Sequence, residues 1–232
     1  MHVTQVTPNL IQLRRFGMVN CWLVRESDGF TLIDTGMGGG ANGTVAAAEA
    51  AGAPIVRILL THAHADHVGS LDALVHLLPD VEVGISKRDA RFLAGDRSFD
   101  TGEGQKERGA WTTTKTVPSL ALEGGMRVGS LEVIETPGHT PGHRSLLDAR
   151  DHTLIGGDVY TTFGGVHVTS HPNWRFPLSY LGTAHPARDL ESAEQLAALE
   201  PSGLAVGHGP FVTRPAPQLS EAIAVARAAL RD

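Results

Sequence analysis

Short apolar runs separated by turn residues fill the first sixty positions of the chain. Residues 3–15 and 18–36 form two such regions, broken by proline, glycine and a Ser-Asp-Gly turn, which is typical of strands. The Ala-rich residues 41–52 end in glycine and predict a helix. The apolar residues 54–60 then predict a buried strand that ends just before a cluster of polar residues.

The rest of the chain alternates between apolar patterns typical of strands and apolar patterns typical of helices. Apolar residues at Leu71, Leu74, Val75 and Leu78 share one helical face, and a proline follows them. Further strands are predicted at 81–86, 129–138, 143–149, 151–158 and 202–209, and further helices at 188–201 and from Leu219 to Leu230. Two long irregular regions remain, 95–118 and 161–186. Non-periodic segments of this length in a compact domain are often functional loops, although some helix within 95–118 is an alternative.

Strands precede helices in both halves of the chain, which predicts an α/β or α+β fold with a layered sheet core. The 232 residues show no linker-like stretch and no internal repeat, so we expect a single domain over 1–232. Hydrophobic residues make up 41% and charged residues 19%, which fits a globular protein with a sizeable core.

The net charge and the composition limit the kinds of partner and the location that we expect. The net charge of −6 comes without any basic tract, which argues against a nucleic-acid partner. No apolar run approaches the roughly 18 residues of a membrane span, and the N-terminus lacks the features of a signal peptide. Cys21 is the only cysteine, so it forms no internal disulfide and is expected to be a small core residue. We therefore expect a cytoplasmic protein that acts on a small molecule, with its oligomeric state left open.

The stretch "THAHADHVGS" at 61–70 carries the strongest chemical signal. It places His62, His64, Asp66 and His67 within six positions, directly after an apolar strand. Two residues apart on an extended segment, His62 and His64 point the same way. Imidazole and carboxylate are ligands for a borderline metal such as zinc. Solvated loop histidines are the alternative, but four ligand-type residues in this order at a strand end favour a metal site.

Three more ligand-type residues follow other predicted strands. His139 lies in "TPGHT", Asp158 in "GGD" and His208 in "GHG". Functional groups in α/β folds commonly gather at strand ends, where loops converge. Seven ligand-type residues suffice for two metal ions that each keep room for water.

These motifs together resemble the metallo-β-lactamase superfamily, and within it the glyoxalase II-like hydrolases. The resemblance implies a four-layer αββα sandwich and a binuclear zinc site, with iron or manganese as alternative metals. It implies His62, His64 and His139 on the first metal, Asp66, His67 and His208 on the second, and Asp158 bridging both. Its hydrolases use a metal-bridging hydroxide, so we expect cleavage of a thioester, ester or lactone.

Other activities stay open on the same scaffold. An acyl-homoserine lactonase is one alternative, because Tyr160 lies two residues after Asp158, close to where such lactonases place a tyrosine. An iron-dependent oxygenase is another, since histidine and aspartate also suit iron. A non-catalytic metal-binding protein is a third alternative, from a different class, and it predicts lost ligands.

Several residues near the motifs have two interpretations each. Asp34 in "LIDTG" either orients a metal ligand from outside the coordination sphere or caps a turn. Asp66 is expected to be a ligand that also orients the hydroxide. Tyr160 either donates to an oxyanion or packs near a strand end, and His143 is expected to be a structural or surface residue. Aromatic residues of the irregular regions either line an apolar substrate pocket or pack their loops: Trp111, Phe163, Trp174 and Phe176.

Overall fold

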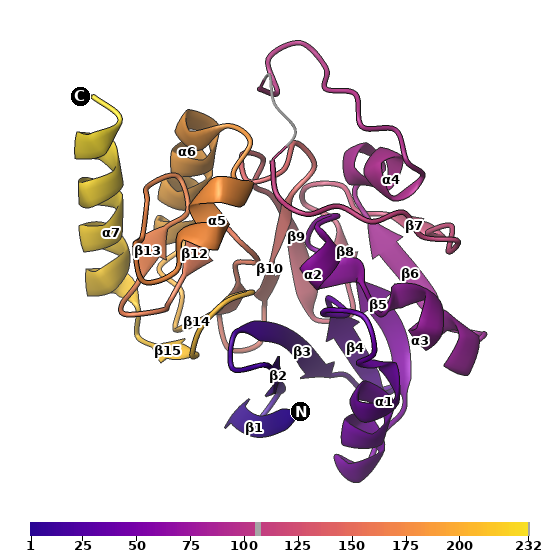
Figure 1. Cartoon of the computed structure of the whole chain (residues 1–232). Coiled ribbons are helices and arrows are strands. Elements are labelled where there is room, and N and C mark those ends of the chain that lie inside the picture. The colour runs from indigo at the N-terminus through magenta and orange to yellow at the C-terminus, as the bar shows by residue number, and fades with distance from the viewer. Residues whose placement is uncertain (105–107, 232) are drawn as a thin grey trace. The chain divides into compact units, whose positions relative to one another are not determined.

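A computed structural model describes residues 1–104 and 108–231 (Figure 1). Contacts divide the chain into two compact units. Unit 1 comprises Met1–Asp96 and Ala110–Leu122, and unit 2 comprises Arg97–Gly109 and Glu123–Asp232. Each unit has its own sheet and its own helices. The expectation of a single domain over 1–232 stays a prediction.

Unit 1 is built on a seven-stranded sheet in sequence order. Its strands are β1 (His2–Thr7), β2 (Leu10–Arg15), β3 (Val19–Arg25), β4 (Phe30–Ile33), β5 (Ile55–Leu59), β6 (Glu82–Ile85) and β7 (Leu120–Ala121). Strands β1 to β4 pair antiparallel through short turns, whereas β4 to β7 pair parallel. Parallel neighbours need crossover connections, and the helices of unit 1 supply them.

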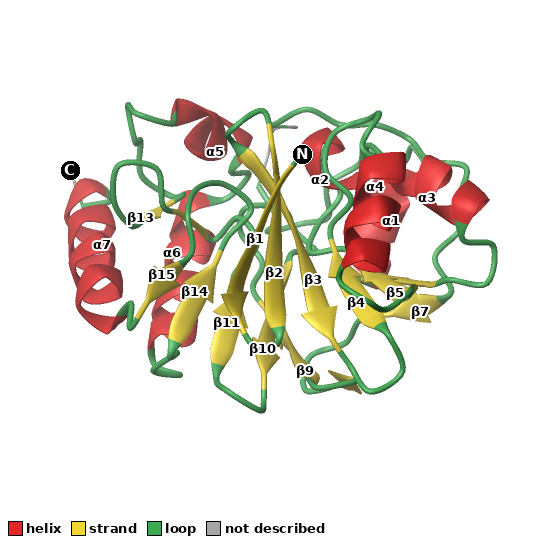
Figure 2. Ribbon diagram, turned by 90° about the horizontal axis from the view of Figure 1, so that it is seen from below, coloured by secondary structure: helices red, strands yellow, loops and turns green. Residues whose placement is uncertain are grey.

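These crossover helices are α1 (Ala41–Ala50), α2 (Ala65–Val68), α3 (Leu71–Leu77) and α4 (Lys87–Leu93). Figure 2 shows α1, α3 and α4 gathered beside β4, β5 and β7. Helix α1 confirms the prediction from the Ala-rich segment, and α3 ends where the spacing of its leucines predicts. The sequence reading missed α4, which starts where Ser86 accepts a hydrogen bond from the Asp89 main chain at 3.1 Å.

Unit 2 contains a six-stranded sheet in the order β15-β14-β11-β10-β9-β8 and a two-stranded sheet of β12 and β13. The strands are β8 (Arg127–Val128), β9 (Leu131–Glu135), β10 (Arg144–Asp148), β11 (Thr153–Ile155), β12 (Tyr160–Thr161), β13 (His167–Val168), β14 (Gly203–Ala205) and β15 (Val212–Thr213). Pairing is antiparallel except between β11 and β14.

The helices of unit 2 are α5 (Pro177–Gly182), α6 (Pro186–Ala197) and α7 (Ala216–Ala229). Helices α6 and α7 lie beside β14 and β15 in Figure 2. Their apolar faces close one core with the sheet. It includes Leu154 and Leu204 from the strands, Leu196 from α6 and Leu219 from α7. The helical spacing of these apolar residues therefore explains why both helices form and which face they bury.

The two irregular regions differ. Residues 161–186 contain part of β12, all of β13 and α5, so that region is more structured than the sequence predicts. Within 95–118 no helix or strand forms among the described residues, and residues 105–107 of that prediction lie outside them. In the part of the chain that the structure describes, every helix is too short or too polar to cross a membrane.

Candidate metal centre

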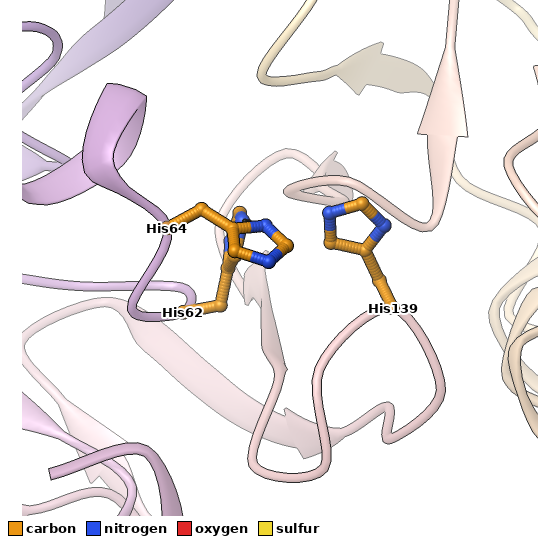
Figure 3. A group of neighbouring side chains, drawn as sticks. All are labelled: His62, His64 and His139. Atoms are coloured by element: carbon orange, nitrogen blue, oxygen red, sulfur yellow. Dashed lines mark hydrogen bonds between the residues drawn. The ribbon is translucent and has the colours of Figure 1, made fainter. Parts of the chain in front are cut away.

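His62 and His64 follow the end of β5 and are buried. Nε2 of His62 lies 3.1 Å from Nδ1 of His64, and the two ring centroids are 4.7 Å apart. Figure 3 shows both rings on the segment that leads into α2, and His139 on the loop after β9. Two imidazole nitrogens at this distance can share a proton or face one cation. The alternation of the extended segment produces this pairing.

His67 and Asp66 lie on α2, the short helix that follows. The His67 ring is buried, and its centroid is 4.0 Å from that of His62. Potential ligand atoms of His62 and His67, and of Asp66 and His67, lie within 4.8 Å of each other. The side chain of Asp66 keeps about a third of its surface exposed. Unit 1 thus gathers four ligand-type side chains at the end of one strand.

Asp34 forms hydrogen bonds with the segment of unit 1 that carries these side chains. It follows β4 in a left-handed conformation with φ of 59°, which aspartate tolerates better than most residues. Its carboxylate accepts hydrogen bonds from the main chain and the hydroxyl of Thr61, both at 2.8 Å. Oδ2 also lies 2.8 Å from Nδ1 of His67. These contacts fix the loop before His62 and the ring of His67. The partners of the Asp34 carboxylate are distant along the chain, so these hydrogen bonds are not those of a local turn cap.

Unit 2 carries the other three ligand-type residues, each from a different loop. His139 follows β9, Asp158 follows β11 and His208 follows β14. All three side chains are buried. Oδ2 of Asp158 lies 3.1 Å from Nε2 of His208 and 3.5 Å from Nε2 of His139. Asp158 therefore stands between two imidazoles, an arrangement that suits a bridging carboxylate.

Neighbouring side chains fix the orientation of these residues. Nδ1 of His139 lies 3.0 Å from the hydroxyl of Thr183, leaving Nε2 toward Asp158. His143 is buried, and its Nε2 accepts the main-chain N–H of Asp158 at 3.0 Å. Nδ1 of His143 lies 2.8 Å from the hydroxyl of Thr136. The expected structural role of His143 therefore includes holding the main chain of Asp158, a contact fifteen residues away along the chain.

Tyr160 lies in the core of unit 2. Its side chain is fully buried, and its hydroxyl donates to the main-chain carbonyl of Ala193 at 2.6 Å. Burial, reinforced by the nearby carboxyl groups of Asp189 and Glu194, raises the pKa of the Tyr160 hydroxyl far above its ordinary value. This environment is the packed alternative of the sequence reading. Donation to an oxyanion would require the hydroxyl to leave Ala193.

The loop aromatics divide into packed and exposed groups. Trp111 contacts the ring of His64 at 4.5 Å between centroids and the buried Phe92 at 4.3 Å. Phe176 packs against His208 at 4.8 Å between centroids. Trp174, by contrast, is 86% exposed. Packing thus accounts for Trp111 and Phe176 but not for Trp174.

Burial also changes the pKa values of two further groups, Cys21 and Asp189. Burial raises the pKa of the Cys21 thiol, and the nearby Asp34 carboxylate raises it further. Cys21 lies on β3 and confirms the prediction of a core cysteine. Burial also raises the pKa of Asp189 well above its ordinary value, against the effect of hydrogen bonds from Thr169 and the Ser170 main chain.

The donor set of both units fits a metal. Imidazole nitrogen and carboxylate oxygen are ligands for zinc and iron. Groups of this kind are costly to bury close together unless a cation or hydrogen bonds compensate them. The hydrogen-bond partners described above engage the outer nitrogens of His67 and His139, as is usual for ligating histidines. The chain therefore carries a candidate metal-binding cluster of histidine and aspartate residues.

Several known proteins are similar to this chain in sequence. Uncharacterized protein YobT of Bacillus subtilis is 44% identical over 211 residues, which cover 90% of this chain and 91% of that protein. A hydroxyacylglutathione hydrolase of Aeromonas salmonicida is 28% identical over 155 residues, covering 65% of this chain and 52% of that protein.

The fold is also shared with solved structures. The structure of TTHA1623 in a di-iron-bound form is similar with a TM-score of 0.66 and 28% identity, and the match covers 93% of this chain and 96% of that one. This likeness confirms the fold class expected from the sequence. The family description "Metallo-beta-lactamase superfamily" matches residues 14–208. The chain belongs to the metallo-β-lactamase superfamily.

Proposed function

We propose that this chain is a binuclear metal-dependent hydrolase that cleaves a thioester, ester or lactone. One observation carries the proposal. This chain belongs to the superfamily, and within each of its two units buried ligand-type side chains lie close to one another. In unit 1 the pair is His62 and His64, 3.1 Å apart. In unit 2 it is His208 and Asp158, 3.1 Å apart. A non-catalytic descendant of the fold is disfavoured because all seven ligand-type residues are retained.

The proposed ligand roles follow the superfamily resemblance. His62, His64 and His139 would hold one ion, Asp66, His67 and His208 would hold the second, and Asp158 would be a ligand of both. Two zinc ions are proposed, and the di-iron form of the similar TTHA1623 makes iron the first alternative. Bound ions of this kind supply a water of lowered pKa as nucleophile and polarise the substrate carbonyl.

Hydrogen bonds within the chain orient the proposed ligand side chains. Asp34 engages Nδ1 of His67 and so presents Nε2 as the ligating atom. Thr183 does the same for His139. Asp66 is the most exposed of the seven ligand-type side chains, so it is the carboxylate best placed to orient a water molecule. No serine or cysteine nucleophile is required, and the buried Cys21 has no part in the reaction.

The substrate is proposed to carry an apolar acyl group. Phe176 packs on the ligand-type His208, so the segment 173–182 starts at the site within unit 2. The same segment exposes Trp174, Leu178 and Leu181, although large apolar side chains gain free energy when they leave water. An apolar substrate group would cover them. This feature favours a lactone or ester with an alkyl chain over a wholly polar thioester.

The similarity to a hydroxyacylglutathione hydrolase supports a glyoxalase II-like thioesterase as the second candidate. An assay on zinc-loaded protein, with metal-free protein as control, separates the two. It compares hydrolysis of S-lactoylglutathione with that of a long-chain acyl-homoserine lactone. Metal-dependent turnover of the lactone supports the apolar substrate, and turnover of the thioester alone supports the glyoxalase II-like activity. If protein with bound zinc hydrolyses neither substrate, the proposed function is contradicted. Oxygen consumption by an iron-loaded sample would then indicate an oxygenase instead of a hydrolase.

A further inference from the structure

A buried carboxyl group in α4 contacts the main chain between two ligand-type histidines. Asp89 is fully buried, and its Oδ2 accepts the N–H of Ala63 at 3.0 Å. Ala63 is the residue between His62 and His64. The hydrogen bond therefore fixes the peptide that sets the directions of both rings.

Helix capping alone does not require this contact. The start of α4 is capped by Ser86, whose hydroxyl accepts the main-chain N–H of Asp89. That bond uses the main-chain N–H of Asp89 and does not involve its carboxyl group. Removing a carboxylate from water is costly unless hydrogen bonds compensate it. The Asp89 side chain meets this cost partly through the main chain of the ligand segment.

Unit 2 also has a buried carboxyl group in the first turn of a helix, here α6. Asp189 lies in the first turn of α6 and is fully buried. Its Oδ2 lies 3.1 Å from the Thr169 hydroxyl, which shares its proton between this oxygen and the main-chain carbonyl of Asp158. Thr169 in turn donates to the main-chain carbonyl of Asp158 at 2.6 Å. Asp189 thus contacts the main chain of the ligand-type Asp158 through the hydroxyl of Thr169.

The loop that carries His139 is pressed against the start of α6. Gly138 has a φ of 146°, and a Cβ atom there would lie 2.3 Å from the main-chain nitrogen of Asp189. The main-chain carbonyls of Gly138 and His139 accept N–H groups of His185 and Ala184 at 2.9 and 3.0 Å. Only glycine allows this close approach, which packs the loop that carries His139 against the first turn of α6.

We propose that Asp89 and Asp189 are positioning residues for the metal site: each holds the main chain of its unit's ligand loops from the first turn of a helix. The proposal rests on the proposed metal-binding function. Neither residue is a ligand. Each acts as a hydrogen-bond acceptor that keeps the ligand loops in the geometry for binding, as outer partners of metal sites commonly do.

The test measures the affinity of the full chain for Zn²⁺ by competition with a chromophoric chelator. Asp89→Ala and Asp189→Ala remove the acceptor, and each should lower the affinity about 10- to 100-fold. Asp89→Asn and Asp189→Asn keep an oxygen that accepts, so each should remain within about threefold of the wild type. Recovery by asparagine is the signature of an acceptor role.

Matched controls separate positioning from stability. Ser86→Ala weakens the start of α4 without touching Ala63, and Asp148→Asn alters a buried carboxyl group of unit 2 that pairs with Arg150. Both should lower the melting temperature while leaving Zn²⁺ affinity unchanged. Amide hydrogen exchange at residues 62–64 should accelerate in Asp89→Ala and not in Ser86→Ala, because only the first variant frees the Ala63 N–H.

Each outcome decides the proposal. Alanine variants with wild-type Zn²⁺ affinity would overturn it, as would equal losses of affinity in the control variants. If an alanine variant does not fold, the asparagine variant carries the test: a loss of tenfold or more there would show that charge, not hydrogen-bond acceptance, matters. Wild-type protein that binds no Zn²⁺ would instead overturn the proposed function, and this inference with it.

Discussion

Oδ2 of Asp34 lies 2.8 Å from Nδ1 of His67, and both side chains are buried, Asp34 directly after β4 and His67 on α2. A carboxylate at Nδ1 favours the proton on that nitrogen and leaves Nε2 with its lone pair. The contact therefore selects the form of His67 that can bind a metal. It also explains why a non-glycine residue keeps the left-handed conformation at position 34.

Replacing Asp34 should weaken metal binding. Asp34→Asn retains the size and the tolerance for positive φ but removes the charge that stabilises the Nδ1 proton of His67. We expect an affinity for Zn²⁺ lower by about 10- to 100-fold, measured by chelator competition. Asp28→Asn is the control, because Asp28 forms an exposed ion pair with Arg57 in the same unit. Equal affinities of Asp34→Asn and the wild type would contradict the role.

Tyr160→Phe should affect stability rather than catalysis. The variant leaves the carbonyl of Ala193 without its hydrogen bond from Tyr160. Loss of such a bond costs about 0.5–1.5 kcal/mol of unfolding free energy, which denaturant unfolding measures. We expect kcat to stay at the wild-type value. A large fall in kcat at unchanged stability would instead show that the hydroxyl reaches the substrate.

Trp174→Ala tests the apolar substrate group. The side chain is 86% exposed, so its removal should change the melting temperature little. If Trp174 contacts the substrate, kcat/KM for a long-chain ester or lactone should fall more than kcat/KM for a short-chain one. Leu77→Ala provides a control, since Leu77 is an exposed apolar residue of unit 1. Loss of stability without any change in chain-length preference would remove Trp174 from the substrate site.

Cys21 should be unreactive in the folded protein. Burial, reinforced by Asp34, raises the pKa of the thiol, and the thiolate is the reactive form. We expect a chromogenic disulfide reagent at neutral pH to modify the thiol only after denaturation. Cys21→Ala should retain metal-dependent activity. Rapid modification of native protein with loss of activity would place Cys21 near the reaction.

The sequence was sufficient for the parts of the molecule that depend on local pattern. The paired histidines at 62 and 64 follow from alternation on an extended segment. Helix α1 follows from its alanines and the glycine after them, and α3 from the spacing of its apolar residues. Helix α4 did not, because its sequence KRDARFL has apolar residues only at Ala90, Phe92 and Leu93, which do not mark one helical face by their spacing. Its serine cap was the signal that was present and missed.

Contacts between distant segments could not be read from the chain. His143 was expected to be structural, but its bond to the Asp158 main chain depends on how β10 and β11 pair. Asp89 and Asp189 look like ordinary acidic residues in the first turn of a helix. Their contacts with ligand loops appear only once the helices are packed. Tyr160 is the opposite case, where closeness in sequence to Asp158 pointed to chemistry and packing placed the hydroxyl on Ala193.

Metal stoichiometry tests the central claim most directly. The metal-free 232-residue chain is titrated with Zn²⁺ by calorimetry, beside His62→Ala and His208→Ala variants that remove one proposed ligand from each ion. We predict two ions per wild-type chain, and for each variant the loss or strong weakening of one. A wild-type chain that binds no Zn²⁺ or Fe²⁺, or variants that bind two ions as tightly as the wild type, would contradict the account.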